Sequence, residues 1–243
     1  MYIQQTEFTN SSSSVSWKEL EALKELYDYT NGSNWIWRNE TLAGKIWDFT
    51  ASSFDPCVEG WQALRCSCYT SSQRIYHPFE YAYYSYHYDY YFSNTTNCRI
   101  VELFLINYGL YGQLPASIFN YLPWLTHLHL ARNTLFGPLP LDDNSTNATS
   151  LELLDVSHNY FSGSFPSYIS KLSNLQYLSV KNNFFSRSIC TELASLLMLG
   201  HLDLSYNAFT SSLMTEIGYM DALSYFSVRK NKLTGSYKLW TNA

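Results

Sequence analysis

Apolar and polar positions follow one pattern six times in the second half of the chain. The six similar segments begin at Ile100, Leu125, Leu151, Leu175, Leu199 and Leu223. Their starts lie 25, 26, 24, 24 and 24 residues apart, and such a nearly fixed period is typical of a repeat protein. Apolar residues occupy positions 1, 4 and 6, as Leu151, Leu154 and Val156 do in the third segment. This spacing predicts a short strand in each segment, with positions 3 and 5 facing solvent.

Position 9 carries an amide in five of the six segments. These residues are Asn133, Asn159, Asn183, Asn207 and Asn231. An inward amide both donates and accepts hydrogen bonds, so it can satisfy backbone groups of neighbouring turns that a leucine would leave unpaired. The first segment has Tyr108 at this position, and we expect the ladder of amides to be irregular at that end.

A glycine and a proline follow the strand in the first three segments: Gly112 and Pro115, Gly137 and Pro140, Gly163 and Pro166. With the 24-residue period, this motif resembles the plant-type leucine-rich repeat, over about residues 16 to 243. The resemblance implies an α/β solenoid: a right-handed leucine-rich repeat superhelix with a concave parallel sheet and an N-terminal helical disulfide cap. The next two segments replace the glycine and proline with Arg187 and Cys190, then with Ser211 and Met214. The sequence therefore does not predict the backbone conformation on the convex side of these two coils.

The region before the repeats predicts a helix and a cross-linked loop. Ser16 and Glu19 have the spacing of a capping box, apolar residues follow at helical intervals, and Asn31-Gly32 is a stop signal. We expect a helix of about fourteen residues. The run Asn34-Trp35, Asp55-Pro56-Cys57, Trp61 and Cys66 resembles the N-terminal cap of plant-type leucine-rich repeat ectodomains. That resemblance implies a disulfide between Cys57 and Cys66 and a cap over the apolar end of the solenoid.

Three regions follow from these boundaries. Residues 1–15 are expected to be a disordered N-terminal segment, residues 16–99 a cap with a tyrosine-rich insertion at 69–97, and residues 100–243 five full repeats and an incomplete sixth. The sixth repeat ends without paired cysteines, which would leave its apolar residues Leu223, Phe226, Val228 and Leu233 exposed to water. We therefore expect a truncated chain. Cys190 is left unpaired, and we expect it to be a buried small apolar residue.

The tyrosine-rich insertion lies between Cys68 and Cys98. A disulfide between these two cysteines would close the insertion into a loop tied at its base. Tyr84, Tyr86, Tyr88 and Tyr90 alternate with other residues, which suits a β-ribbon with one aromatic face. Such a ribbon could be a structural element packed on the cap, a rigid secondary recognition ridge, or a site of carbohydrate stacking or tyrosine modification. The sequence leaves these alternatives open.

Ligand binding is expected at the solvent-facing positions of the strands. Stacked parallel strands place equal positions in columns, and columns 3, 5, 7 and 8 combine aromatic and charged residues, as interaction surfaces do. The candidate ligand-binding residues are Phe104, His127, His129, Asp155, Tyr177, His201, Asp203, Tyr206 and Tyr225. Basic residues at positions 7 and 8 are Arg132, His158, Lys181, Arg229 and Lys230.

Catalysis and metal binding find little support on this surface. His127, His129 and Asp155 could form a chelating trio, or Asp155 could stabilise His129 as a cation in a pH-sensitive contact. Asp155 and Asp203 share a column about 10 Å apart, near the spacing in inverting glycosidases, but an open sheet does not exclude water. The sequence has no nucleophile elbow, zinc-protease motif or glycine-rich phosphate loop. We therefore predict no catalytic residues, no metal and no cofactor.

Cysteines and glycosylation motifs indicate an oxidising compartment. Four of the five cysteines lie between positions 57 and 98. Acceptor motifs for N-glycosylation occur at Asn10, Asn31, Asn39, Asn94, Asn144 and Asn147. No apolar run suits a signal peptide or a membrane span, and the net charge of −5 argues against nucleic acid as a partner. We expect an extracellular or cell-surface location, with the signal peptide and any membrane anchor absent from this truncated chain.

These features predict a non-catalytic extracellular recognition module that binds a protein, peptide or glycan ligand on the concave face. The family resemblance implies a receptor-like protein or receptor kinase in signalling, for which a co-receptor is a further candidate partner. The alternative is a secreted inhibitor of cell-wall-degrading glycoside hydrolases, a function that some proteins with this repeat have.

Overall fold

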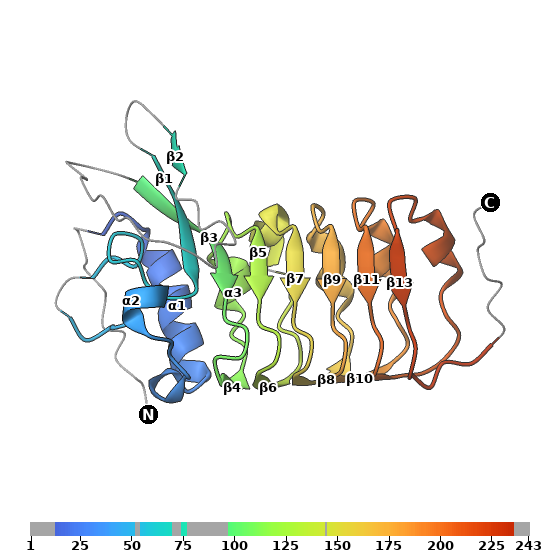
Figure 1. The fold of residues 1–243 in the computed structure, drawn as a ribbon. Coiled ribbons are helices and arrows are strands. Elements are labelled where there is room, and N and C mark those ends of the chain that lie inside the picture. The colour runs from blue at the N-terminus through green and yellow to red at the C-terminus, as the bar shows by residue number, and fades with distance from the viewer. Residues whose placement is uncertain (1–12, 52–53, 70–73, 77–96, 144, 236–243) are drawn as a thin grey trace.

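The protein is an elongated leucine-rich repeat solenoid with a cap at its N-terminal end (Figure 1). The structure is a computed structural model that describes residues 13–51, 54–69, 74–76, 97–143 and 145–235. Two β-sheets run along the coils, and short helices connect them on the far side. The fold class predicted from the repeat period is confirmed.

Helix α1 (Trp17–Tyr29) opens the cap. Its N-cap residue Ser16 and Glu19 form a complete capping box, and the helix has 13 residues, close to the predicted length. Asn31 adopts a left-handed conformation (φ 61°) after the helix ends. A 3₁₀ turn η1 (Gly32–Asn34) and a short helix α2 (Glu40–Ala43) follow.

Tryptophan rings fill the core of the cap. The ring centroids of Trp47 and Trp61 lie 5.7 Å apart, and those of Trp35 and Trp47 lie 5.1 Å apart. The indole N–H of Trp47 donates to the carbonyl oxygen of Gln62 at 2.8 Å, so the buried ring keeps its hydrogen bond. Such large side chains bury much apolar area and anchor the loop between α2 and the first strand.

The first sheet forms the face on which ligand binding was predicted. Its strand order is β13-β11-β9-β7-β5-β3-β1-β2. The strands are β1 (Leu64–Tyr69), β2 (Arg74–Tyr76), β3 (Asn97–Phe104), β5 (His127–His129), β7 (Leu153–Asp155), β9 (Tyr177–Ser179), β11 (His201–Asp203) and β13 (Tyr225–Ser227). Strands β3 to β13 are parallel, whereas β1 runs antiparallel to both of its neighbours. We call the solvent-facing side of this sheet the concave face.

A second parallel sheet, which the sequence analysis did not anticipate, runs in the order β12-β10-β8-β6-β4. Its strands are β4 (Tyr111–Gln113), β6 (Thr134–Gly137), β8 (Tyr160–Ser164), β10 (Phe184–Arg187) and β12 (Ala208–Phe209). Each coil then passes through a short helix: α3 (Ser117–Asn120), η2 (Ser145–Ser150), η3 (Ser167–Lys171), η4 (Thr191–Ser195) or η5 (Thr215–Tyr219).

The predicted asparagine ladder is present. The side-chain oxygen of Asn159 accepts from the backbone N–H of Leu135 at 3.0 Å, and its amide donates to the carbonyl oxygens of Leu130 and Val156. Asn133, Asn183, Asn207 and Asn231 repeat this pattern on their own coils. Tyr108 replaces the amide in the first coil and is instead buried against Trp37 of the cap.

The coils that lack the glycine and proline keep the same backbone path. Arg187 and Ser211 adopt φ angles of 68° and 69°, and Arg187 remains paired with Phe209 in the second sheet. The convex side of these coils, which the sequence did not predict, therefore has the same backbone conformation as in the coils with glycine. Cys190 is free and partly buried, its thiol lies 3.7 Å from the carbonyl oxygen of Pro166, and burial raises its pKa to about 11.

The last coil is less covered than the coil before it. Leu223, Phe226, Val228 and Leu233 are partly buried, rather than open to water as the sequence predicted. Their counterparts in the preceding coil are fully buried: Leu199, Leu202, Leu204 and Phe209.

Candidate ligand-binding face

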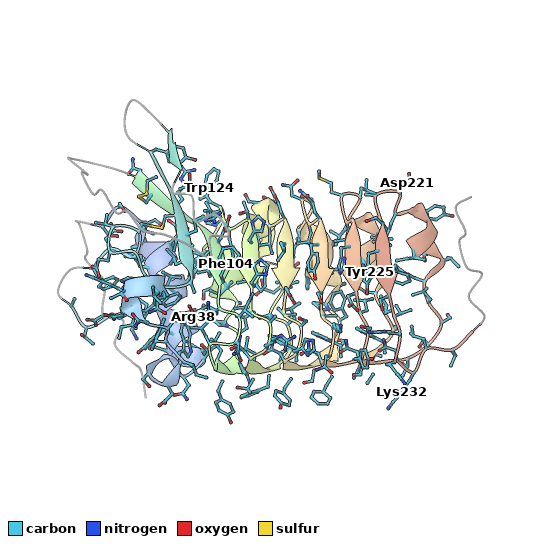
Figure 2. The ribbon with its side chains drawn as sticks, viewed as in Figure 1. Arg38, Phe104, Trp124, Asp221, Tyr225 and Lys232 are labelled. Atoms are coloured by element: carbon cyan, nitrogen blue, oxygen red, sulfur yellow. A yellow bond between two sulfur atoms is a disulfide. The ribbon has the colours of Figure 1, made fainter. Side chains whose placement is uncertain are left out.

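The strand register places the candidate residues in two columns. Position 3 aligns Glu102, His127, Leu153, Tyr177, His201 and Tyr225 on neighbouring strands. Position 5 aligns Phe104, His129, Asp155, Ser179, Asp203 and Ser227. Figure 2 shows Phe104 and Tyr225 near opposite ends of this row of strands. The columns run from the cap to the last described coil.

Three rings form a continuous stack at the C-terminal end of the position 3 column. The ring centroids of Tyr177 and His201 lie 4.2 Å apart at 11° between planes, and those of His201 and Tyr225 lie 4.1 Å apart at 4°. Tyr225 is 43% exposed, and the other two rings are half-buried. Because each ring holds its neighbour, the stack is a rigid aromatic surface that needs little ordering before it binds a partner.

A second ring cluster lies near the cap. Phe104 and His129 stack with centroids 4.8 Å apart, and His127 lies 6.3 Å from His129. Glu102 accepts from the guanidinium of Arg65 at 2.8 Å, which joins this end of the concave face to strand β1. The two ring clusters bring together six of the nine predicted binding residues.

A pH-sensitive contact with Asp155 would require a raised histidine pKa, and the structure shows the opposite. Burial lowers the pKa of His129, and this effect exceeds the opposite effect of Asp155. Burial likewise lowers the pKa of His201. The structure therefore does not favour the alternative in which Asp155 stabilises His129 as a cation, because removal of the ring from water outweighs one nearby carboxylate.

Asp155 and Asp203 serve the ends of their own strands. One carboxylate oxygen of Asp155 accepts from the backbone N–H of Ser157 at 2.9 Å, and Asp203 bonds Ser205 in the same way. Asp203 is only 6% exposed. No group of three or more His, Cys, Asp or Glu in the described ranges is arranged to hold a metal ion. These carboxylates have a structural function at the centre of the face.

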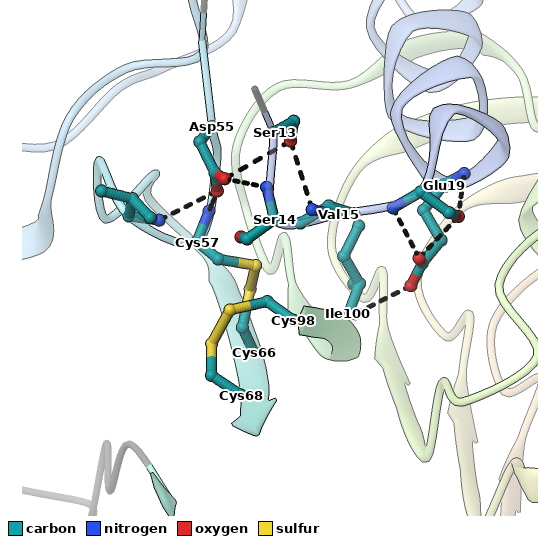
Figure 3. The surroundings of a disulfide bond; sticks show 12 residues. Ser13, Ser14, Val15, Glu19, Asp55, Cys57, Cys66, Cys68, Cys98 and Ile100 are labelled. Atoms are coloured by element: carbon teal, nitrogen blue, oxygen red, sulfur yellow. Dashed lines mark hydrogen bonds between the residues drawn. A yellow bond between two sulfur atoms is a disulfide. The ribbon is translucent and has the colours of Figure 1, made fainter. Parts of the chain in front are cut away.

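Disulfides close the cap and the base of the tyrosine-rich insertion. The structure links Cys57 to Cys66 and Cys68 to Cys98, and the second bond joins the paired strands β1 and β3 (Figure 3). Ser14 accepts from the backbone N–H of Cys98 and donates its own N–H to Asp55. The cap therefore starts ahead of residue 16.

Several predicted residues lie outside the described residues. These are the ridge tyrosines Tyr84, Tyr86, Tyr88 and Tyr90 and the glycosylation candidates Asn10, Asn94 and Asn144. Asn147 lies in η2, and its side chain is not described. Asn31 and Asn39 are exposed, and the side chain of Asn39 accepts from the backbone N–H of Thr41 at 2.9 Å.

A row of aromatic residues on the second sheet was missed by sequence reasoning. Tyr111 and Phe136 lie 5.5 Å apart, Tyr160 and Phe184 lie 5.8 Å apart, and Tyr111, Tyr160 and Phe184 are each more than half exposed. The signal in the sequence is an aromatic residue at position 10 or 12 of four successive repeats, close to the asparagine and glycine positions of the repeat motif.

Inward-facing leucines, an asparagine ladder and a 24-residue coil define a leucine-rich repeat solenoid. The Leucine Rich Repeat family model matches residues 150–172. Comparison with curated protein sequences gives no match.

Solved ectodomains of plant receptor kinases have the same fold. The ectodomain of the receptor kinase SOBIR1 from Arabidopsis thaliana is 22% identical with a TM-score of 0.64, covering 90% of this chain and 96% of that chain. The BIR2 ectodomain from Arabidopsis thaliana is 21% identical with a TM-score of 0.62, covering 89% and 94%. The Arabidopsis receptor kinase HAESA, in complex with the peptide hormone IDA and the co-receptor SERK1, is 32% identical with a TM-score of 0.52, covering 55% and 22%.

The chain has the leucine-rich repeat fold with an N-terminal cap, and it is similar to plant-type leucine-rich repeat ectodomains, as its repeat motif predicted. It spans nearly the whole length of the SOBIR1 and BIR2 ectodomains but about a fifth of the HAESA chain. None of the helices in the described ranges has the length and hydropathy that a membrane span requires.

Proposed function

We propose that this protein is a non-catalytic extracellular recognition module that binds a peptide or protein ligand on its concave face. The stacked rings of Tyr177, His201 and Tyr225 carry the proposal. Tyrosine supplies large contact area with few rotatable bonds, and rings already ordered by stacking lose little entropy on binding. The stack also lies on parallel strands, which hold it more precisely than loops would.

The similarity to solved plant receptor kinase ectodomains supports a function within a receptor-like protein in signalling. HAESA, which is 32% identical over 55% of this chain, was solved with a peptide hormone and a co-receptor. Two disulfides in the cap agree with an oxidising compartment, and so with the extracellular or cell-surface location. Exposed Asn31 and Asn39 are accessible for glycosylation there.

Selection from a random peptide display library tests the proposal. Peptides selected on the wild-type chain should lose binding to the double variant Tyr177→Ala with Tyr225→Ala by at least about tenfold, since such aromatic anchors contribute about 2 kcal/mol or more each. Tyr160→Ala with Phe184→Ala is the matched control, because it removes two stacked and even more exposed rings from the second sheet. Selected peptides that bind both double variants equally well would refute concave-face binding.

A further inference from the structure

The column at position 8, just beyond the C-terminal ends of the strands, has the same backbone conformation in every coil. Each residue at position 8 is in the left-handed region: Asn107, Arg132, His158, Asn182, Tyr206 and Lys230. Backbone hydrogen bonds join successive coils here, from the N–H of Arg132 to the oxygen of Ser157 at 2.9 Å and from His158 to Lys181 at 2.8 Å. Positions 7 and 8 therefore continue the register of the sheet beyond the ends of its strands.

Positions 7 and 8 together carry a concentration of positive charge. We define the cationic strip as Arg132, Lys181, Arg229 and Lys230 together with His158, whose coil lies between those of Arg132 and Lys181. The ion pairs found within the described ranges involve none of its four permanent cations. Unpaired cations on a chain of net charge −5 create a local field that attracts an anionic partner.

Two carboxylates lie beside the strip, and both are already engaged. Asp155 and Asp203 each direct one oxygen to the backbone N–H two residues later. They reduce the positive potential at the centre of the strip, but four permanent positive charges face two negative ones. The strip keeps a net positive charge at neutral pH.

The rings on this face offer a sugar little free aromatic surface, because stacking covers both faces of His201 and one face of each neighbouring tyrosine. His201 lies between Tyr177 and Tyr225 at 4.2 and 4.1 Å, and the guanidinium of Arg229 lies over the ring of Tyr206 at 5.2 Å. A sugar ring stacks on a free aromatic face. Ring edges and hydroxyl groups remain available, and these suit the side chains and amides of a peptide.

We propose that the cationic strip binds the carboxylate side chains of an acidic peptide that lies in extended form across the coils. This inference rests on the proposed function and adds the chemical class of the ligand. Arg132 and Lys230 are four coils apart, or about 19 Å at about 4.8 Å per coil. An extended peptide of about six residues has this length.

Protonation of His158 should make the affinity for an acidic peptide depend on pH. Its Nδ1 lies 3.1 Å from the side-chain nitrogen of Asn182. Burial, then Arg132 and Lys181, lower the pKa of His158, while Asp155 and Asp203 raise it less. A bound carboxylate would offset the two cations and raise the pKa of His158 again. Binding therefore takes up a proton, and affinity increases as pH falls.

Fluorescently labelled hexaglutamate provides the test on the full chain at low salt. Because the protein is negative overall, hexaglutamate should bind more tightly than hexaglutamine only through the strip. Arg132→Gln with Lys181→Gln should weaken binding about tenfold. Lys18→Gln with Lys171→Gln removes the same charge from exposed positions on α1 and η3, away from the strip, and should change affinity less than about twofold. Affinity should rise from pH 7.5 to 5.5 in the wild type but not in His158→Gln.

Three results would contradict the proposal that the cationic strip binds an acidic peptide. Equal affinity for hexaglutamate and hexaglutamine, or equal losses in both double variants, would show that the strip is not an anion site. Strip-dependent binding of hexagalacturonate without binding of hexaglutamate would replace the acidic peptide with an anionic glycan. Selected neutral peptides that need Tyr177 and Tyr225 but are insensitive to Arg132→Gln would refute the strip and leave the proposed function intact.

Discussion

Gly112 lies directly against the last turn of α1, since a Cβ on this glycine would stand 1.8 Å from the carbonyl oxygen of Tyr29. Gly163 occupies the same place in the third repeat, where a Cβ would meet nothing within 4 Å. Both have positive φ, at 146° and 88°. One motif position therefore has two functions: close packing of the cap at the first coil, and backbone conformation alone at the third.

Substitution of these two glycines should separate the two effects. Gly163→Ala is expected to lower the free energy of unfolding by about 1 kcal/mol, the usual cost of a left-handed alanine. Gly112→Ala adds a clash with rigid backbone and should cost about 3 kcal/mol or more. Urea unfolding of both variants measures the difference, and equal losses would contradict the close contact with Tyr29.

Asn159→Leu tests the asparagine ladder. Leucine fills the space but leaves the N–H of Leu135 without its acceptor, whereas the carbonyl oxygens of Leu130 and Val156 still accept from the amides of Asn133 and Asn183. An unsatisfied buried group costs about 1 to 3 kcal/mol, so we expect a loss in this range. Asn174→Ala is the control, because its exposed amide makes a single bond to Thr149. Equal thermal unfolding of the two variants would contradict the ladder's function.

The repeat pattern was sufficient to predict the concave face in detail. Apolar positions 1, 4 and 6 and a constant spacing determine which side chains point outward, so the pairing of His201 with Tyr225 follows from counting residues. The stacking of their rings does not follow, because it depends on side-chain rotamers.

Features that depend on tertiary context were not predictable. The second sheet continues past the coils that have glycine because Arg187 accepts positive φ within β10 and still pairs with Phe209. The aromatic row of Tyr111, Tyr160 and Phe184 becomes visible only when that sheet is known. The pKa of His129 depends on the burial of its ring, and the alignment of residues in columns does not reveal how buried a side chain is.

The disulfide between Cys68 and Cys98 should stabilise the fold in proportion to the loop that it closes. The two cysteines are 30 residues apart, so loss of the bond in Cys68→Ser with Cys98→Ser should cost about 3.5 kcal/mol in the loop-entropy model. Deletion of residues 77–92 removes 16 residues, and 30 − 16 leaves a separation of 14. The bond should then contribute about 0.7 kcal/mol less.

The same deletion tests the tyrosine-rich insertion. Strands β1 and β3 pair from Leu64 with Leu103 to Tyr69 with Asn97, so the fold should survive without the insertion. Guanidine unfolding of the four combinations of deletion and serine substitutions gives both quantities, with Cys190→Ala in every protein to exclude thiol exchange. A deletion variant that does not fold would show that residues 77–92 are a structural part of the cap.

Glu19 should give the cap a pH-dependent stability. It is 4% exposed, and its carboxylate accepts from the backbone N–H of Ser16 at 3.2 Å and of Ile100 at 3.0 Å. Burial raises the pKa of Glu19, and the hydrogen bonds from Ser16 and Ile100 lower it less. The folded protein therefore binds this proton more readily than the unfolded chain. As pH falls from 7 toward the ordinary value of 4.5, this group should increase stability.

Two substitutions separate the proton from the hydrogen bonds. Glu19→Gln keeps an oxygen that accepts from Ile100 and cannot titrate, so its stability relative to the wild type should fall as pH decreases from 7 to 5. Glu19→Ala removes the acceptor and should cost about 2 kcal/mol at pH 7. Urea unfolding at pH 7, 6 and 5 measures both. A constant difference between the wild type and Glu19→Gln across this range would mean that Glu19 has the same pKa in the folded and unfolded chain, and that its contacts with Ser16 and Ile100 fully compensate its burial.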